Sequence, residues 1–435
     1  MSARISASGV VMADRLEVRL FGRPVGILEI KGPLRSPEDW SFQYRADYVA
    51  QVGAQPISAR MPVRSEAYTA ALVQHWACNL LPEGGARQSI TDLRPETPLD
   101  DFDLLSLLGR ECAGALEFRP VDGGECENAR AMEGSDDWDL EKLILGKGLD
   151  APWFPFNLRG HRTLAGAQDK VAVVVEQDGF IRLPVRGELS SHLLKPDSQR
   201  LPGLRDREAL GMALALAVGL PVAKADPVEI ASQRALLIER YDRAAKAGGD
   251  VVALHQEDFC QLLGLPSQFK YEVPNGRSLG DIVGWCRVHL ADDQTAESDL
   301  MSWVVFNLLI GNADAHAKNL SILQYADGGR RLAPAYDLVP TISFSEGVVD
   351  RTPALRIGNA NRIDTVTRHD LALLAESCRW PIDRLHSRIM ELAGRISECL
   401  PTVREALVEQ GCREEGMARY AEAILMQFNR IKTLC

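Results

Sequence analysis

The sequence has 435 residues, of which 46% are hydrophobic and 25% are charged. This composition is typical of globular proteins and excludes a wholly disordered, collagen-like or coiled-coil chain, and the length is enough for two or three domains. The 49 Lys and Arg and 60 Asp and Glu residues give a net charge of −11, the wrong sign for a protein that grips nucleic-acid phosphates over a broad surface.

Neither export nor membrane insertion is expected. Only the short apolar stretch 9–13 occurs before charge resumes at Asp14, which is too little for a secretory signal. The longest uncharged apolar run, 209–223, is shorter than the roughly 20 residues that cross a bilayer, and it predicts a buried helix that ends near Gly219. The nine cysteines are scattered without a C-x-x-C pair, so we expect a reducing, cytoplasmic location and no contact with membranes.

The chain begins with a predicted antiparallel sheet. Two β-prone segments, 16–20 and 23–30, flank a turn at 21–22. Helical periodicity follows over 65–81 and over 101–108, and each of these segments stops at a Gly or Pro signal.

Residues 119–138 are rich in Gly, Asp and Glu and lack apolar periodicity, which predicts an exposed linker. The next segment, 160–243, follows the order β-β-β-α-β-β, and from residue 256 the pattern is mainly helical with a β-like interruption near 320–338. Strands are expected over 170–175, 180–183, 192–196, 226–230 and 234–241, and the helix among them over 206–218. The parts expected are an accessory domain (1–118), the linker (119–138), an α+β lobe (139–245) and a helical lobe (246–435).

The most informative motif lies in the helical part. Asp314 and Asn319 have the D-x-x-x-x-N spacing of a kinase catalytic loop, and Asp337 follows after a predicted hairpin that turns at 327–329. Phosphotransfer requires a carboxylate that orients and deprotonates the acceptor hydroxyl, and an amide oxygen and a second carboxylate that hold magnesium at the phosphates. Asp314, Asn319 and Asp337 are candidates for these three roles.

In isolation, an Asp and an Asn in a loop more often cap helices or form turns. Here the polar residues lie between the apolar segments 303–310 and 320–323, where turn formation alone does not require them. His316 and Lys318, in the same loop, are expected to support the site, although a lone loop histidine more often bonds the backbone.

A kinase also needs elements upstream of its catalytic loop. Lys195 at the end of a predicted strand, Glu208 near the start of the following helix, and a possible adenine-binding hinge at 239–241 occur in the expected order. Taken singly, Lys195 could be a surface lysine and Glu208 a charge favoured by the helix dipole. The small-residue segment 164–170 is a candidate phosphate loop, although it is not a G-x-G-x-x-G motif and such a turn usually has no further role.

At these motifs the sequence resembles the HipA family of bacterial toxins, Ser/Thr protein kinases of type II toxin–antitoxin modules. The resemblance implies an α+β, bilobal fold similar to eukaryotic protein kinases, with a β-rich N-terminal subdomain and a mainly helical C-terminal lobe. The motifs that carry it are Asn79 to Glu83, Asp103 to Arg110, Leu164 to Lys170, Glu239 to Arg243, Gln256 to Gln261, Lys270 to Glu272, NADAHAKN at 312–319 and APAYDL at 333–338.

The resemblance also implies ATP and Mg²⁺ as cofactors and a protein substrate in the translation machinery, notably an aminoacyl-tRNA synthetase, whose phosphorylation leads to growth arrest and persistence. It implies a HipB-like helix-turn-helix antitoxin, through which the complex binds operator DNA. The acidic charge agrees with an antitoxin that supplies most of the contacts to DNA.

Residue by residue, the resemblance places the catalytic aspartate on Asp314, the magnesium ligands on Asn319 and Asp337, and the ATP lysine on Lys195, in agreement with the interpretation from spacing. Glu208 is expected to hold Lys195. The residues expected to bind the nucleotide are Ala165, Gly166, Ala167, Gln168, Asp169, Lys170, Lys195, Glu239, Arg240, Tyr241, His316 and Lys318.

The sequence departs from the family pattern at Thr163, where relatives often carry an autophosphorylated serine. The β-methyl group of threonine restricts χ1, so self-phosphorylation is expected to be slower or absent. A phosphate at this position would repel the phosphates of ATP and disfavour the closed loop.

Two other functions remain open at this point. A silent pseudokinase could serve only as a scaffold for an antitoxin and its operator, although a scaffold has no need of Lys195, Asp314, Asn319 and Asp337 together. A small-molecule kinase would use the same pattern of residues, and only the N-terminal domain favours the protein kinase.

Three basic residues, Arg200, Arg205 and Arg207, could contact DNA or order an activation segment. A solvated loop is the simpler expectation for them, because surface charges usually need no partner.

Overall fold

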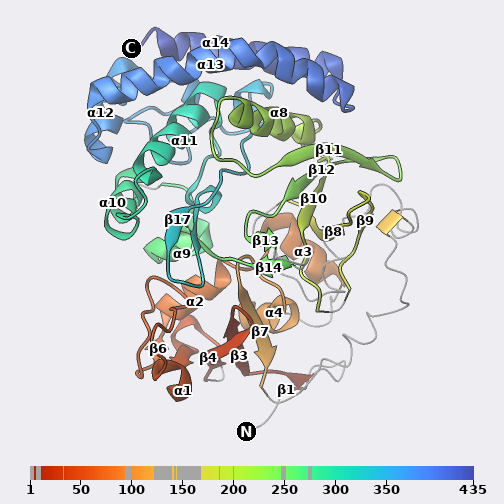
Figure 1. The fold of residues 1–435 in the computed structure, drawn as a ribbon, viewed down its shortest axis with the longest axis vertical. Helices are drawn as coiled ribbons and strands as arrows, with labels where there is room; N and C mark the ends of the chain where they lie inside the picture. Colours follow the sequence, from red (N-terminus) through yellow and green to blue (C-terminus); the bar gives the residue numbers. More distant parts are fainter. Residues whose placement is uncertain are drawn as a thin grey trace. The chain divides into compact units, whose positions relative to one another are not determined.

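The computed structural model describes residues 4–5, 11–32, 34–93, 99–121, 140–141, 144, 168–185, 187–198, 200–245, 251–272 and 277–435. The chain forms two compact units (Figure 1). The first contains residues 1–195, 242–267 and 323–329, and the second contains 196–241, 268–322 and 330–435. Within the described ranges, no helix is both long enough and apolar enough to cross a membrane.

The first unit contains a five-stranded antiparallel sheet in the order β6-β5-β4-β3-β7. Along β3, buried Leu16, Val18 and Leu20 alternate with half-exposed residues, as expected for a strand with one face on the core. The predicted hairpin and its turn are confirmed. The strands are β3 (Arg15–Leu20), β4 (Arg23–Ile30), β5 (Trp40–Tyr44), β6 (Tyr68–Thr69) and β7 (Leu116–Pro120).

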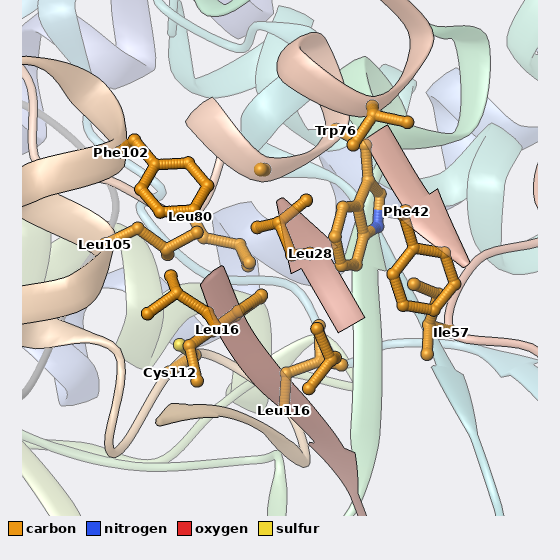
Figure 2. Packing of buried hydrophobic residues seen from close by; sticks show 14 of the residues in the cluster. Leu16, Leu28, Phe42, Ile57, Trp76, Leu80, Phe102, Leu105, Cys112 and Leu116 are labelled. Atoms are coloured by element: carbon orange, nitrogen blue, oxygen red, sulfur yellow. The ribbon is translucent and has the colours of Figure 1, made fainter. Parts of the chain in front are cut away.

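Helices cover this sheet and close its core. Figure 2 shows Leu16 and Leu28 from the sheet packed with Trp76 and with Phe102 and Leu105, all of them buried. The predicted helix over 101–108 is confirmed. Helices in the described part of this unit include α1 (Ala46–Val49), α2 (Ala71–Cys78), α3 (Gly84–Leu93), α4 (Asp101–Leu108) and α9 (Phe259–Leu263).

The predicted helix over 65–81 is wrong in its first part. Tyr68 and Thr69 pair with β5 as an edge strand, and the hydroxyl of Tyr68 donates a hydrogen bond to the carbonyl of Pro62. Ala70 then has a φ of 62°, which a helix does not allow, so α2 begins only at Ala71. Pairing with a neighbouring strand therefore overrides the local helical pattern.

The three strands predicted before the helix in segment 160–243 are confirmed in the first unit. In the antiparallel arrangement, β8 (Val171–Val175) lies between β9 (Ile181–Arg182) and β10 (His192–Pro196). Further strands are β13 (Arg243–Ala245), β14 (Val251–Ala253) and β15 (His255–Asp258). The predicted linker falls mostly outside the described residues, and β7 occupies its first two positions.

The second unit is mainly helical. Helix α13 packs against α8, α11 and α14, and these four helices lie together in Figure 1. Helix α11 is buried on almost every side, which explains why its sequence is apolar all round. The helices are α8 (Leu204–Ala217), α10 (Leu279–His289), α11 (Ala296–Ile310), α12 (Arg368–Cys378), α13 (Ile382–Glu409) and α14 (Glu414–Lys432).

Short strands and 3₁₀ turns connect these helices. The predicted hairpin of strands after α8 is confirmed as β11 (Ala225–Ile230) and β12 (Gln233–Glu239). The β-like interruption near 320–338 is confirmed as β16 (Ser321–Gln324) and β17 (Arg330–Leu332). The 3₁₀ turns are η3 (Ala317–Asn319), η4 (Thr341–Ser343) and η5 (Ile363–Thr365).

The expectation of a solvated basic loop is wrong for two of its three residues. Arg200 is exposed, but Arg205 and Arg207 lie within α8 and are only 2% and 7% exposed. Arg205 pairs with Asp206, which also accepts two hydrogen bonds from Arg234. Guanidinium groups buried in this way have no surface left for DNA.

One glycine fixes the approach of α8 to the chain after Asp337. A Cβ at Gly211 would lie 1.9 Å from the backbone oxygen of Leu338, whereas a Cβ at Gly284 on α10 would meet nothing within 4 Å. Gly211→Ala should lower the free energy of unfolding by about 1–3 kcal/mol through overpacking. The control Gly284→Ala should raise it by about 0.5–1 kcal/mol through helix propensity. Urea unfolding of the two variants measures this difference, and effects of equal sign would contradict it.

Candidate functional site

The loop that contains Asp314 leaves α11 in a fixed direction. Gly311 ends the helix with a left-handed φ of 67°, a conformation that glycine adopts readily. The side-chain amide of Asn312 donates to Asn307 at 2.7 Å and accepts the backbone N–H of Asp314 at 3.1 Å. Both ends of this amide therefore hold the start of the loop.

The structure brings Asp314 and Asn319 together. The carbonyl of Asp314 accepts the N–H of His316 at 2.8 Å and the side-chain amide of Asn319 at 3.1 Å. This bond engages the nitrogen end of the Asn319 amide, so its oxygen is the end that can serve as a ligand. Asn319, His316 and Lys318 are buried, whereas Asp314 is exposed.

Asp337 lies in the second unit with its backbone held on both sides. Its φ of 58° is unusual for a residue other than glycine, and such conformations persist only where the surroundings enforce them. Before it, Ala335 makes two backbone hydrogen bonds to 221–223, of 2.8 and 2.9 Å. After it, the carbonyl of Leu338 packs against Gly211.

Tyr336 connects Asp337 to the loop. Its hydroxyl donates to the carbonyl of Lys318 at 2.6 Å and accepts from the hydroxyl of Ser321 at 2.7 Å. Its ring stacks on that of Tyr241, with centroids 5.2 Å apart. Tyr336 was not among the residues predicted for the site, although an aromatic residue directly before Asp337 is a signal that the sequence contains.

A second connection runs through the segment that follows Asp337. The buried hydroxyl of Thr341 donates to the carbonyl of Gly311 at 2.9 Å and accepts the N–H of Ala313 at 2.8 Å. Arg207 of α8 donates to the hydroxyl and the carbonyl of Ser343, at 2.8 and 3.2 Å. Arg207 is therefore bonded to the segment that follows Asp337.

The negative charge of Asp337 acts on the carboxyl group of Asp314. The pKa of Asp314 is raised from 3.8 to about 6, first because surrounding protein atoms displace water from its carboxyl group and then because Asp337 is negative. A hydrogen bond from Tyr271 and the charge of Lys270 act in the opposite direction. Asp314 is nevertheless exposed by surface area, so solvent moderates this shift.

The donor set fits a magnesium ion that binds together with phosphates. In the described part of the chain, no three His, Cys, Asp or Glu side chains are grouped to hold a metal. Magnesium usually binds through one or two carboxylates, waters and substrate phosphates rather than in an all-protein cage. Asp337 and Asn319 supply oxygen ligands of this kind.

The other predicted residues are distributed over both units. The first unit contains Lys195, buried at the end of β10, and Gln168, Asp169 and Lys170 directly before β8. The second contains Glu208, fully buried on α8, and Glu239, Arg240 and Tyr241 at the end of β12. Thr163, Ala165, Gly166 and Ala167 lie outside the described residues.

Comparison with known proteins identifies the family. The chain matches the HipA-like C-terminal domain over residues 162–400 and the HipA N-terminal domain over residues 16–119. The chain belongs to the HipA family. The resemblance inferred from the motifs is therefore confirmed.

Relatives cover most of this HipA-family chain. It is 35% identical to the Sinorhizobium fredii protein named "Putative kinase Y4mE", over 84% of this chain and 87% of that protein. It is 26% identical to "Serine/threonine-protein kinase toxin HipA" of Shewanella oneidensis, over 89% of each chain. The structure of Shewanella oneidensis HipA with HipB and operator DNA matches with a TM-score of 0.73 and 23% identity, over 95% of this chain and 97% of that one. The predicted α+β, kinase-like fold is confirmed.

The two neighbouring carboxylates predict a pH-dependent stability. A pKa raised from 3.8 to about 6 means that the folded HipA-family protein binds more protons than the unfolded chain between these values, so its stability falls as pH rises through this window. In EDTA at pH 7.5, Asp314→Asn should raise the free energy of unfolding by on the order of 1 kcal/mol, after allowance for solvent. Calorimetry should show that the difference disappears near pH 4. A difference that is independent of pH would contradict this assignment.

Proposed function

We propose that this protein is an ATP- and Mg²⁺-dependent Ser/Thr protein kinase and the toxin of a toxin–antitoxin pair. The observation that carries this proposal is the arrangement of three residues. The side-chain amide of Asn319 is hydrogen-bonded to the carbonyl of Asp314 in one loop. Asp337 is connected to this loop through its neighbour Tyr336, and its negative charge raises the pKa of Asp314. Membership of the HipA family, with relatives named as kinases, supports it.

In this proposal Asp314 orients the acceptor hydroxyl and accepts its proton. The hydroxyl oxygen forms a bond to the γ-phosphorus of ATP, and the bond from that phosphorus to the oxygen of the leaving ADP breaks. A base whose pKa lies near 6 is mostly ionised at neutral pH and remains basic enough to accept the proton. Asn319 and Asp337 would hold Mg²⁺, which supplies charge neutralisation at the phosphates when bound.

The remaining assignments concern ATP. Lys195 and the segment 165–170 would bind the phosphates, and Glu208 would hold Lys195. Residues 239–241 would contact adenine, and the stacking of Tyr241 on Tyr336 supports a connection between this segment and Asp337. His316 and Lys318 would complete the nucleotide site. At Thr163, self-phosphorylation would be slower than at the serine of relatives, or absent, because the β-methyl group restricts χ1.

We propose the same domain boundaries as the sequence predicts. The accessory domain would be 1–118, the linker 119–138, and the two kinase lobes 139–245 and 246–435.

The proposed partners follow from the family. One solved relative is a HipA in complex with HipB and operator DNA. We infer a HipB-like helix-turn-helix antitoxin that neutralises this chain and makes most of the contacts to operator DNA, in keeping with the net charge of −11. The proposed target is a cytoplasmic protein of the translation machinery, such as an aminoacyl-tRNA synthetase, whose phosphorylation would cause growth arrest and persistence.

Transfer of γ-phosphate from Mg-ATP tests the proposal. Wild type, Asp314→Asn and the exposed-loop control Asp292→Asn are incubated with a bacterial extract, and labelled proteins are identified by mass spectrometry. Asp314→Asn should retain nucleotide binding and lose about 10²–10⁴-fold in transfer rate, the usual contribution of a general base. Asp292→Asn should match wild type.

Other results would favour the alternatives. Nucleotide binding by wild type without transfer to any protein would favour the pseudokinase scaffold. Transfer only to added small hydroxyl compounds would favour a small-molecule kinase.

A further inference from the structure

Tyr271 lies beside Asp314 on a segment that is attached to the loop. The carbonyl of Lys270 accepts the backbone N–H of Ala317 at 3.2 Å. The residue directly before Tyr271 is therefore bonded to the same loop that carries Asp314 and Asn319.

The residue directly after Tyr271 is also anchored. The N–H of Glu272 donates to the carbonyl of Ala354 at 2.7 Å, and the N–H of Ala354 donates to the carbonyl of Ala313 at 2.8 Å. The carboxylate of Glu272 accepts the N–H of Arg356 at 2.9 Å. Because both of its neighbours are hydrogen-bonded in this way, the backbone of Tyr271 is held in place beside the loop.

The side chain of Tyr271 meets the carboxylate that would act as the base. Its hydroxyl donates a hydrogen bond to Oδ1 of Asp314 at 3.1 Å. Its ring meets the ring of His316 edge-on, with centroids 5.4 Å apart, and the Lys270 ammonium lies 5.5 Å from its centroid. Although these contacts fix the ring, Tyr271 is 44% exposed, so an acceptor can approach it from solvent.

We propose that Tyr271 is a positioning residue of the phosphotransfer site, whose hydroxyl holds Oδ1 of Asp314 so that the acceptor hydroxyl meets a carboxylate of fixed orientation. The proposal rests on the proposed kinase function. The χ2 rotation of an aspartate is broad, so a donor anchored by its own backbone restricts it. An ionised carboxylate has two oxygens and about four acceptor positions, so Tyr271 and the acceptor hydroxyl can bind it together.

Tyr271→Phe tests this role because it removes only the hydroxyl. Phe269→Leu is the matched control, since Phe269 is an equally exposed aromatic residue (44%) two positions away. The full chain is assayed with Mg-ATP and dephosphorylated casein as acceptor, and kcat, the KM for ATP and Tm are measured. Tyr271→Phe should lower kcat about 10-fold through loss of orientation and leave the KM for ATP within about twofold. Tm should not change, and Phe269→Leu should match wild type.

Different results would overturn different claims. A kcat for Tyr271→Phe equal to wild type, or a rise in the KM for ATP with kcat unchanged, would overturn the positioning role. An increase in kcat would also overturn it, because it would show that the hydroxyl competes with the acceptor. Absence of transfer by wild type to casein and to the bacterial extract alike would overturn the proposed function and this inference with it, so the two failures can be distinguished.

Discussion

The candidate site depends on one buried hydroxyl group. The side chain of Thr341 bonds the carbonyl of Gly311 and the N–H of Ala313, which are the backbone groups at the start of the loop that carries Asp314. Buried backbone groups without a partner are costly, so this hydroxyl satisfies the loop and attaches it to the chain that follows Asp337. Asp314 and Asp337 are therefore brought into one region by a contact between segments, which their spacing in the sequence does not reveal.

Two further contacts fix the position of Asp337 relative to the loop that carries Asp314. The hydroxyl of Tyr336 joins the residue before Asp337 to the loop, and Gly211 lets α8 approach the residue after it. A site assembled in this way needs little reorganisation before it binds charge. It also places Asp314 and Asp337 close enough for repulsion to raise the pKa of Asp314, so the geometry that suits phosphotransfer reduces stability when no cation is bound.

Local signals were sufficient for part of this structure. The hairpin at 16–30, the helix at 101–108 and the order β-β-β-α-β-β were predictable because alternation, caps and turn residues lie within each segment. The spacing of Asp314 and Asn319 also pointed to one loop. Contacts between segments distant in sequence were not predictable. Such contacts make 68–69 an edge strand and bury Arg205 and Arg207. They also place Thr341, Tyr336 and Tyr271 at the site.

The most direct test of this account compares Thr341→Val with Thr341→Ser in γ-phosphate transfer from Mg-ATP. Valine has nearly the shape of threonine but leaves the N–H of Ala313 without its buried partner, whereas serine keeps the hydroxyl. The carbonyl of Gly311 loses one of two donors and keeps the N–H of Ile342 at 3.0 Å. We expect Thr341→Val to lower the free energy of unfolding by about 1–3 kcal/mol and kcat at least about 10-fold, with Thr341→Ser close to wild type. Equal transfer rates for Thr341→Val and Thr341→Ser would show that the loop and Asp337 do not depend on this hydroxyl.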